Sequence, residues 1–218
     1  SRGYGRCSKG YVAGKGRNAL EIGDEPWQIM HSCYPTKVSV CEKRSEGLKR
    51  MLEESDAPKV VVLDDAYQHR YITAGLYILL TDYARPYFRD YVLPAGRLRE
   101  ARSGAKRADI IVVTKCPSDL SETEQQRIRK CLRLLPHQSL FFSKMEYGVL
   151  WNPFSEADPL THGTNVNAPI CNMRTLDALL VCGIAQPKEF VKYFQAQCAS
   201  VNVLSFSDHH RFTAADIS

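Results

Sequence analysis

The chain has 218 residues, of which 44% are hydrophobic and 24% charged, so it can bury a core and is not expected to be largely disordered. Its formal net charge of +5 is too small to decide between a phosphate, an acidic lipid surface and a nucleic acid as an anionic partner. The eight cysteines include no CxxC pair, which disfavours a zinc site or a thioredoxin-like centre and favours free thiols in a reducing cytosol.

Six short apolar runs along the chain predict β-strands. Each is a continuous apolar run more than an alternating one, which is typical of strands buried on both faces of a parallel sheet. They occupy residues 37–41, 59–63, 76–80, 109–113, 178–182 and 201–206.

Helical patterns lie between several of these runs. One surrounds residues 44–54, and a second begins at Ser121, which forms a capping box with Glu124. A third helix can start at Pro187. The alternation of strands and helices predicts an α/β fold with a mostly parallel sheet and flanking helices.

The composition changes between residues 151 and 169, where polar residues, Pro and Gly replace any helical period. This predicts a linker or hairpin at 149–170. It would join a first α/β domain at 1–148 to part of a second, smaller α/β domain at 171–218. No apolar run approaches the roughly 20 residues that span a bilayer.

The strongest local signal is the pair Asp64 and Asp65, which follows the apolar run 59–63. Carboxylates at the C-terminal end of a strand lie where α/β proteins bind ligands, and in P-loop NTPases such an Asp holds Mg²⁺ directly or through water. The simpler interpretation is an acid pair that caps the next turn. Crowding of polar groups favours function here, because three more follow at once, namely Gln68, His69 and Arg70.

A second cluster is the sequence LPAGRLRE at residues 93–100. Its Pro and Gly make a rigid turn that presents Arg99 and Glu100 together. Arg99 can meet a phosphate, and Glu100 can meet a metal ion or a hydroxyl. A surface ion pair explains the same pattern equally well.

Two further clusters suggest proton transfer. Asp24 lies in a Gly-Asp-Glu-Pro turn signature, which is either only a turn or a rigid mount for a general base. Near the C-terminus Asp208 precedes His209 and His210, and an adjacent Asp can orient an imidazole and raise its basicity. A capping or surface histidine cluster is as consistent with that second pattern.

A glycine-rich segment at residues 10–16 imitates a phosphate-binding P-loop without being one. Three residues separate its first two glycines where four are needed, and Gly16 replaces the Ser or Thr that binds Mg²⁺. The sequence contains no Walker A motif elsewhere. Because the chain begins at Ser1, within what reads as a working motif, we expect a truncated segment that lacks its P-loop and is inactive alone.

Seven ordered blocks together resemble the tetraacyldisaccharide 4'-kinase family, and the resemblance extends from residue 1 to residue 212. The chain departs from the family pattern at Ala66-Tyr67, where Gly-Phe is usual, and at Arg97, where Pro is usual. Ala66 would matter only if its φ had to be positive. The blocks are SRGYGR at 1–6, GDEP at 23–26, DDAYQHR at 64–70, LPAGRLRE at 93–100, VTK at 113–115, GIAQP at 183–187 and FSDHHRFT at 206–213.

The resemblance implies a P-loop NTPase-like kinase core at 1–148 that uses ATP and Mg²⁺. The core would phosphorylate the 4'-hydroxyl of a tetraacyldisaccharide 1-phosphate to give lipid IVA in lipid A biosynthesis. The reaction is expected at the cytoplasmic face of the bacterial inner membrane, with no nucleic acid and no obligate protein partner. The implied roles are a base, Asp24, assisted by His209; a Mg²⁺ and nucleotide group, Asp64, Asp65 and Glu100; and positioning residues, Gln68, His69 and Arg99.

Two other function classes compete with this interpretation. A metal-dependent phosphoesterase is suggested by the Asp-His-His triplet at 208–210, but the DxD metal motif that accompanies such a triplet is absent from the sequence. A nucleotide-binding or nucleic-acid-binding module is supported only by the net charge. Against it, the aromatic residues are not interleaved with basic ones as in RNA-binding proteins.

Overall fold

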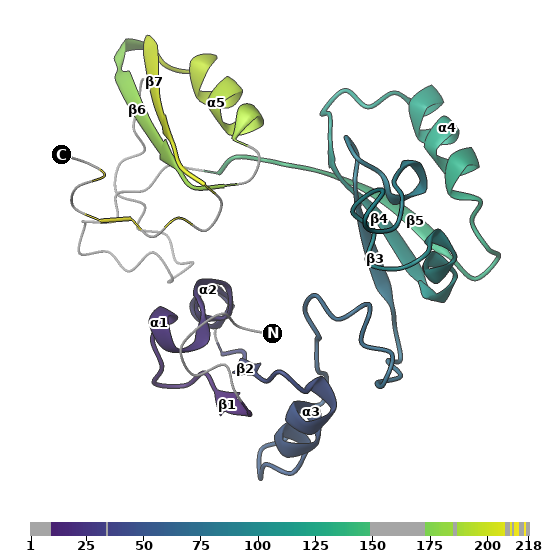
Figure 1. The fold of residues 1–218 in the computed structure, drawn as a ribbon. Coiled ribbons are helices and arrows are strands. Elements are labelled where there is room, and N and C mark those ends of the chain that lie inside the picture. The colour runs from purple at the N-terminus through teal and green to yellow at the C-terminus, as the bar shows by residue number, and fades with distance from the viewer. Residues whose placement is uncertain are drawn as a thin grey trace. The chain divides into compact units, whose positions relative to one another are not determined.

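The computed structural model describes residues 10–33, 35–148, 173–184, 187–207, 210, 212–213 and 216. The chain divides into two compact units, residues 1–147 and 148–218, each of mixed helix and strand (Figure 1). The predicted α/β class is thereby confirmed. The linker predicted at 149–170 lies entirely outside the described residues, and the division into domains at 1–148 and 171–218 stays a prediction.

The first unit begins with a small antiparallel pair. β1 (Val12–Ala13) pairs with β2 (Ser39–Val40), so the strand predicted at 37–41 is reduced to two residues and is not part of a parallel sheet. Val40 is completely buried although its strand is short. The apolar run therefore marks a buried position here more than a long strand.

Two short helices follow β1. α1 (Ala19–Ile22) begins at Asn18 with a capping box, and α2 (Asp24–Ser32) follows directly after Gly23. The turn predicted at 23–26 is wrong, because these residues start a helix. Gly23 has a φ of 99°, which bends the chain between the two helices. Pro26 fits in the first turn of α2, where an amide N–H has no helical partner to lose.

α3 (Arg44–Leu52) confirms the helix predicted around 44–54. The strand predicted at 59–63 is wrong: the segment forms no strand in the described part of the chain. Val60 and Val62 are 78% and 84% exposed. The physical reason is that β-branched residues favour a strand only where a neighbouring strand and a packing surface are present.

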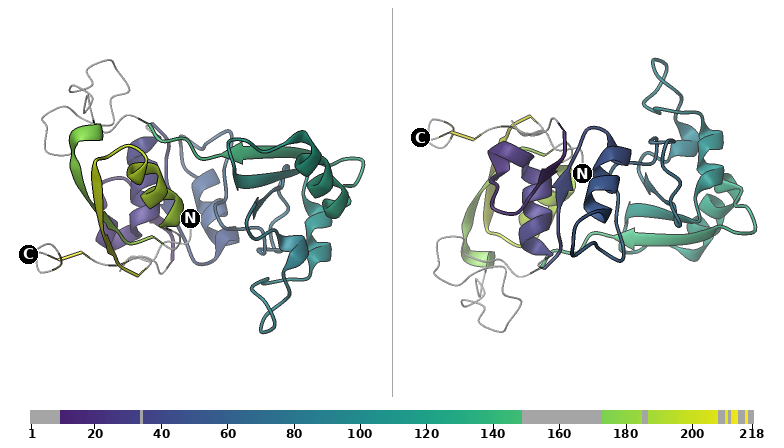
Figure 2. Two further views of the ribbon diagram at one scale, coloured as in Figure 1. Left: turned by 90° about the horizontal axis from the view of Figure 1, so that it is seen from above. Right: turned by 90° about the horizontal axis from the view of Figure 1, so that it is seen from below.

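A three-stranded parallel sheet dominates the rest of the first unit. β3 (Ile78–Asp82), β4 (Ile110–Cys116) and β5 (Ser139–Lys144) pair in the order β3-β4-β5. Two 3-10 helices, η1 (Tyr87–Arg89) and η2 (Arg102–Arg107), lie in the connection from β3 to β4. α4 (Glu122–Leu132) connects β4 to β5 and lies along one side of the sheet (Figures 1 and 2).

The two faces of this sheet differ strongly in exposure. On the face toward α4, Ile111 and Val113 are 1% exposed and share the core with Ile128 and Leu132. On the opposite face, the register aligns Leu80 of β3 with Phe141 of β5, and these side chains are 64% and 55% exposed. The prediction of strands buried on both faces is therefore wrong for the described residues, because only one face of the sheet is covered.

The second unit contains a parallel β-α-β arrangement. β6 (Asp177–Cys182) pairs in parallel with β7 (Ser200–Ser205), and α5 (Lys188–Gln195) connects them and packs against β7. A short 3-10 helix, η3 (Met173–Thr175), precedes β6. Within the described parts of both units, no helix is long and apolar enough to cross a membrane.

Candidate functional site

The paired carboxylates predicted at the strand end lie in a turn that follows residues 60–63. Asp65 has a φ of 45°, a left-handed conformation that Asp tolerates better than most residues. Its neighbour Ala66 has no positive φ, so the departure from the family pattern at Ala66 carries no backbone strain. The strained position of this turn is Asp65 itself.

Asp65 forms an ion pair with Arg99. The Nη1 atom of Arg99 lies 3.2 Å from Oδ2 and 3.4 Å from Oδ1 of Asp65. Both side chains are more than half exposed, and ion pairs in water add little to stability. The pair therefore orients the two side chains, and it joins two of the predicted site residues that are 34 positions apart in sequence.

A second and less exposed ion pair holds Glu100. The Nη2 atom of Arg107 donates to Oε1 at 2.8 Å and to Oε2 at 3.0 Å, and it also donates to the Tyr67 carbonyl at 3.2 Å. The guanidinium lies 4.8 Å from the centre of the Tyr67 ring. The hydrogen bond to Glu100 raises the pKa of Arg107, so the Arg107 guanidinium stays positively charged at any ordinary pH. We call this arrangement of Arg107 on Glu100 the Arg107 clamp.

Tyr67 and Gly104 complete the support of Glu100. The Tyr67 hydroxyl donates to the Gly104 carbonyl at 2.9 Å, and burial raises the pKa of Tyr67 to about 12, so the hydroxyl stays protonated as a donor. A Cβ atom on Gly104 would lie 2.6 Å from Oε2 of Glu100. Glycine at position 104 therefore leaves the space in which the Glu100 carboxylate lies.

The loop that presents Arg99 and Glu100 is fixed by its own backbone. The Leu98 N–H donates to the Tyr91 carbonyl at 2.9 Å, and the Leu93 N–H donates to the Leu98 carbonyl at 3.0 Å. A Cβ atom on Gly96 would lie 2.2 Å from the Tyr91 carbonyl oxygen, so only glycine fits at this close approach. The rigid turn predicted from Pro and Gly is thus present.

Gln68 and His69 lie in the same turn as Asp65. The His69 N–H donates to the Ala66 carbonyl at 2.8 Å, which closes the turn, and the Gln68 side chain is exposed. His69 also lines a cavity of about 410 Å³. The other residues of that cavity are Glu42, Lys43, Arg44, Ser45, Tyr71 and Ile72.

Asp24 is exposed in the first turn of α2, where a carboxylate also stabilises a helix by interacting with its dipole. His209 lies outside the described residues, so its predicted partnership with Asp24 stays a prediction. The neighbouring His210 stacks on Phe206 with ring centres 4.4 Å apart, and its Nε2 atom lies 3.3 Å from Oδ2 of Asp216. These contacts give His210 a structural role within the second unit.

The structure therefore brings together some predicted residues and adds others. It pairs Asp65 with Arg99 and Glu100 with Arg107. Sequence reasoning missed the roles of Tyr67, Gly104 and Arg107, since nothing in their spacing indicates that they converge on Glu100. Within the described ranges, no group of three or more His, Cys, Asp or Glu side chains is close enough to hold a metal ion.

Lys115, in the block VTK at 113–115, joins the ends of two strands. Lys115 is the second-last residue of β4 and has a φ of 55°, and its Nζ atom lies 3.2 Å from Oδ2 of Asp82 at the end of β3. This ion pair ties together the carboxyl ends of two adjacent parallel strands. Such strand ends are where α/β proteins bind ligands.

Comparison with known proteins identifies the family. Residues 1–218 match the family described as Tetraacyldisaccharide-1-P 4'-kinase. The chain is 43% identical over 220 residues to a protein of Bacteroides thetaiotaomicron, 42% over 218 residues to one of Flavobacterium johnsoniae, and 41% over 221 residues to one of Porphyromonas gingivalis. Each of these relatives is named Tetraacyldisaccharide 4'-kinase.

The three alignments cover 100% of this chain but 58%, 61% and 58% of the respective relative. The chain thus spans about three fifths of the length of these curated relatives. No solved structure matches the chain. The match over the complete chain shows that it belongs to the tetraacyldisaccharide-1-P 4'-kinase family.

Proposed function

We propose that this protein transfers the γ-phosphate of ATP to the 4'-hydroxyl of a tetraacyldisaccharide 1-phosphate, which gives lipid IVA in lipid A biosynthesis. The observation that carries the proposal is the pair of clamped carboxylates, Asp65 with Arg99 and Glu100 with Arg107, in a chain of this family. Phosphoryl transfer depends mainly on positioning and on neutralisation of charge, and these residue types suit both. The phosphoesterase alternative has no comparable support.

The proposal includes the finer architecture and the location of the reaction. We infer a P-loop NTPase-like kinase core at 1–148 and part of a second α/β domain at 171–218. The parallel order β3-β4-β5, with polar groups gathered beyond the strand ends, supports the first assignment. A lipid substrate of this kind supports action at the cytoplasmic face of the bacterial inner membrane, without nucleic acid or an obligate protein partner.

The adjacent carboxylates fit a Mg²⁺ ion. Asp64 and Asp65 are exposed oxygen donors, and proteins usually hold Mg²⁺ by one or two carboxylates together with substrate phosphates and water. When bound, Mg²⁺ would neutralise charge on the phosphates of ATP. We assign Asp64 and Asp65 to this ion. Glu100 is the third predicted ligand, but in this structure it accepts from Arg107 and does not complete a three-carboxylate group with them, so it would have to move to reach the ion.

The remaining predicted residues position the reactants. Arg99 orients Asp65 and can also donate to a phosphate oxygen, because a guanidinium has five N–H donors and Asp65 accepts from only one of its nitrogens. Gln68 and His69 extend from the same turn. Asp24 is proposed to accept the proton of the attacking sugar hydroxyl, with His209 as its supporting group.

The test is transfer of radiolabel from γ-labelled ATP to the tetraacyldisaccharide 1-phosphate in detergent micelles with Mg²⁺. We expect the full-length protein to label the lipid, whereas residues 1–218 alone are predicted to be inactive, and we expect Asp65→Asn in the full-length protein to lower kcat by about 10²-fold or more. Asp24→Asn should lower kcat by about 10²–10⁴-fold, as expected for loss of a general base. Glu46→Gln, which breaks an exposed ion pair with Arg50 on α3, is the matched control and should be silent. Failure of the unmodified full-length protein to label the lipid would refute the proposal.

A further inference from the structure

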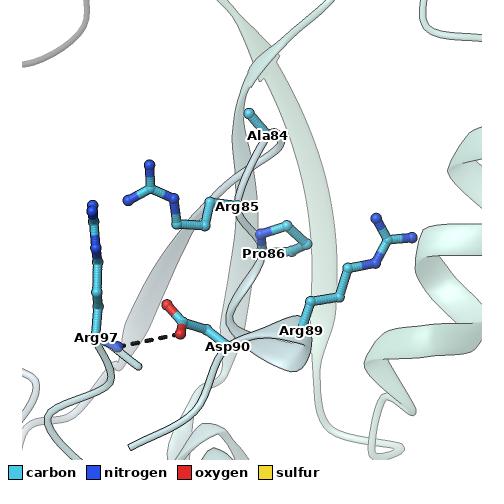
Figure 3. Close-up of a pocket in the computed structure, with 6 residues that line it drawn as sticks. All are labelled: Ala84, Arg85, Pro86, Arg89, Asp90 and Arg97. Carbon is cyan, nitrogen blue, oxygen red and sulfur yellow. Dashed lines mark hydrogen bonds between the residues drawn. The ribbon is translucent and has the colours of Figure 1, made fainter. Parts of the chain in front are cut away.

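A small basic cavity lies beyond the carboxyl end of β3. It has a volume of about 370 Å³ and lies in the connection between β3 and β4 (Figure 3). That volume falls near the lower end of the range for small-molecule sites. The lining residues are Ala84, Arg85, Pro86, Arg89, Asp90 and Arg97.

The backbone around this cavity is held in place by hydrogen bonds. The Asp82 side chain accepts from the Ala84 N–H at 2.9 Å, and the Asp82 carbonyl accepts from the Arg85 N–H at 3.1 Å. The Arg89 N–H donates to the Pro86 carbonyl at 3.0 Å. The three arginine side chains therefore extend from fixed positions, which reduces the entropy lost when they bind a ligand.

The charges around the cavity are unbalanced. Three arginines face one aspartate, which leaves a net charge of +2 on the lining. Oδ1 of Asp90 accepts hydrogen bonds from two backbone amides, those of Tyr91 at 2.8 Å and Arg97 at 3.2 Å. Among the described residues, none of the guanidinium groups of Arg85, Arg89 and Arg97 forms an ion pair with a carboxylate, so their charges remain available.

Figure 3 shows how the arginine side chains are arranged. Arg85 and Arg97 extend toward the same side of the cavity, above the Asp90 carboxylate, whereas Arg89 extends on the other side of Pro86. Like charges that share a site repel each other, and an anion between them relieves that repulsion. The planar fork of each guanidinium matches the oxygens of a phosphate group.

We propose that Arg85 and Arg97, flanked by Arg89, bind a phosphate group of a substrate in this cavity. The recess suits one phosphate or a diphosphate more than an extended polyanion, because its lining is confined to residues 84–97. Two substrates of the proposed reaction carry such a group, the nucleotide and the sugar 1-phosphate. The proposal of a phosphate site stands on the cavity alone, and only the choice between these two sources rests on the proposed function.

Direct binding tests the phosphate site independently of any activity. Inorganic phosphate and pyrophosphate would be titrated into the full-length protein by calorimetry at low ionic strength. Arg85→Gln and Arg97→Gln should each weaken binding about 10-fold, the usual effect of removing one charge-assisted hydrogen-bonding group, and Arg89→Gln should weaken it less. Circular dichroism and melting curves check that each variant is folded.

The matched control is Arg127→Gln, which removes an exposed arginine that is already paired with Glu124 on α4. It should leave the affinity for phosphate unchanged. Absence of binding to the unmodified protein would overturn the proposal. So would equal affinities in the unmodified protein and the triple variant, or an equal loss of affinity in Arg127→Gln.

A kinetic arm distinguishes the two sources. A raised KM for the lipid alone in Arg85→Gln would identify the sugar 1-phosphate, and a raised KM for ATP alone would identify the nucleotide. If phosphate binding falls in this variant while neither KM changes, the phosphate site is supported and its use by either substrate is refuted. If the protein has no kinase activity at all, the proposed function fails, and the titration still decides on the site.

Discussion

Two sets of arginines lie within 23 positions of each other in the β3–β4 connection, and they are held in opposite ways. Arg99 and Arg107 each pair with a carboxylate, whereas Arg85, Arg89 and Arg97 have no carboxylate partner among the described residues. The paired guanidiniums each fix an acid, although Arg99 retains further N–H donors for a phosphate, whereas the unpaired ones have their whole charge available for a ligand. The same residue type thus serves two purposes, and the partner decides which.

The largest effect is expected at Glu100, the carboxylate of the shorter and less exposed ion pair. Glu100→Gln keeps the shape of the side chain but removes the charge, so we expect kcat to fall by about 10²–10³-fold, as for loss of one electrostatic group in an active site. Steady-state kinetics of the full-length enzyme would measure this. Glu124→Gln is the control, because Glu124 also pairs with an arginine, but on the exposed surface of α4. Similar losses in both variants would remove the distinction between a site pair and a surface pair.

The second prediction is that loss of a paired arginine lowers kcat, whereas loss of an unpaired arginine raises KM. Arg107→Gln releases Glu100, so it should lower kcat by about 10–100-fold, the usual effect of losing a residue that supports a ligand or catalytic group. The loss in Arg85→Gln should instead appear mainly as a raised KM, because that arginine is proposed to bind the substrate. Initial rates over a range of both substrate concentrations give the two parameters. If both variants lose only kcat, the two sets of arginines have the same role.

The third prediction concerns Gly96, which directly precedes Arg97 of the unpaired set and lies three positions before Arg99 of the paired set. Gly96→Ala places a methyl group against the Tyr91 carbonyl and the Asp90 carboxylate, so it should destabilise the first unit by about 1–3 kcal/mol, as overpacking does. It should also disturb phosphate binding and catalysis together. Urea denaturation measures the stability. Gly75→Ala is the control, because a Cβ atom there would meet nothing within 4 Å; equal effects of the two substitutions would contradict the packing argument.

The sequence predicted the regular elements of the fold better than their surroundings. The runs at 76–80, 109–113, 178–182 and 201–206 correspond to β3, β4, β6 and β7, and all three predicted helices are present. β5 was not predicted, because its apolar run is only Leu140, Phe141 and Phe142 between polar residues. The strand predicted at 59–63 was wrong for the opposite reason. Its β-branched residues have a strong strand propensity, but no neighbouring strand pairs with them in the described chain.

The candidate site was only partly predictable. The motifs indicated Asp65, Arg99 and Glu100, because charged residues gather in few positions after an apolar run and after a rigid turn, although the run before Asp65 forms no strand. They did not indicate that Glu100 is held by Arg107 or that Gly104 leaves space for it. Such contacts depend on how the β3–β4 connection folds back on itself, which has no period in the sequence. The unpaired arginines were likewise missed, since their significance lies in the absence of a nearby described carboxylate.

The last and smallest prediction concerns Tyr67, which supports the Arg107 clamp. Tyr67→Phe removes the hydrogen bond to the Gly104 carbonyl and should cost about 1 kcal/mol of stability at neutral pH.

Burial raises the pKa of Tyr67 from 10 to about 12 in the folded protein. Between these values the unfolded chain has lost the proton that the folded protein retains, so stability should fall as the pH rises from 10 to 12. The stability of Tyr67→Phe should fall less steeply over this pH range. Some decrease should remain, because burial also raises the pKa values of Tyr11 and Tyr87. Tyr71→Phe is the control, because Tyr71 is 96% exposed, and chemical denaturation at several pH values would compare the three proteins. An unchanged slope in Tyr67→Phe would mean that the hydroxyl ionises as easily in the folded protein as in the unfolded chain, and that the ring beneath Arg107 is not shielded from water.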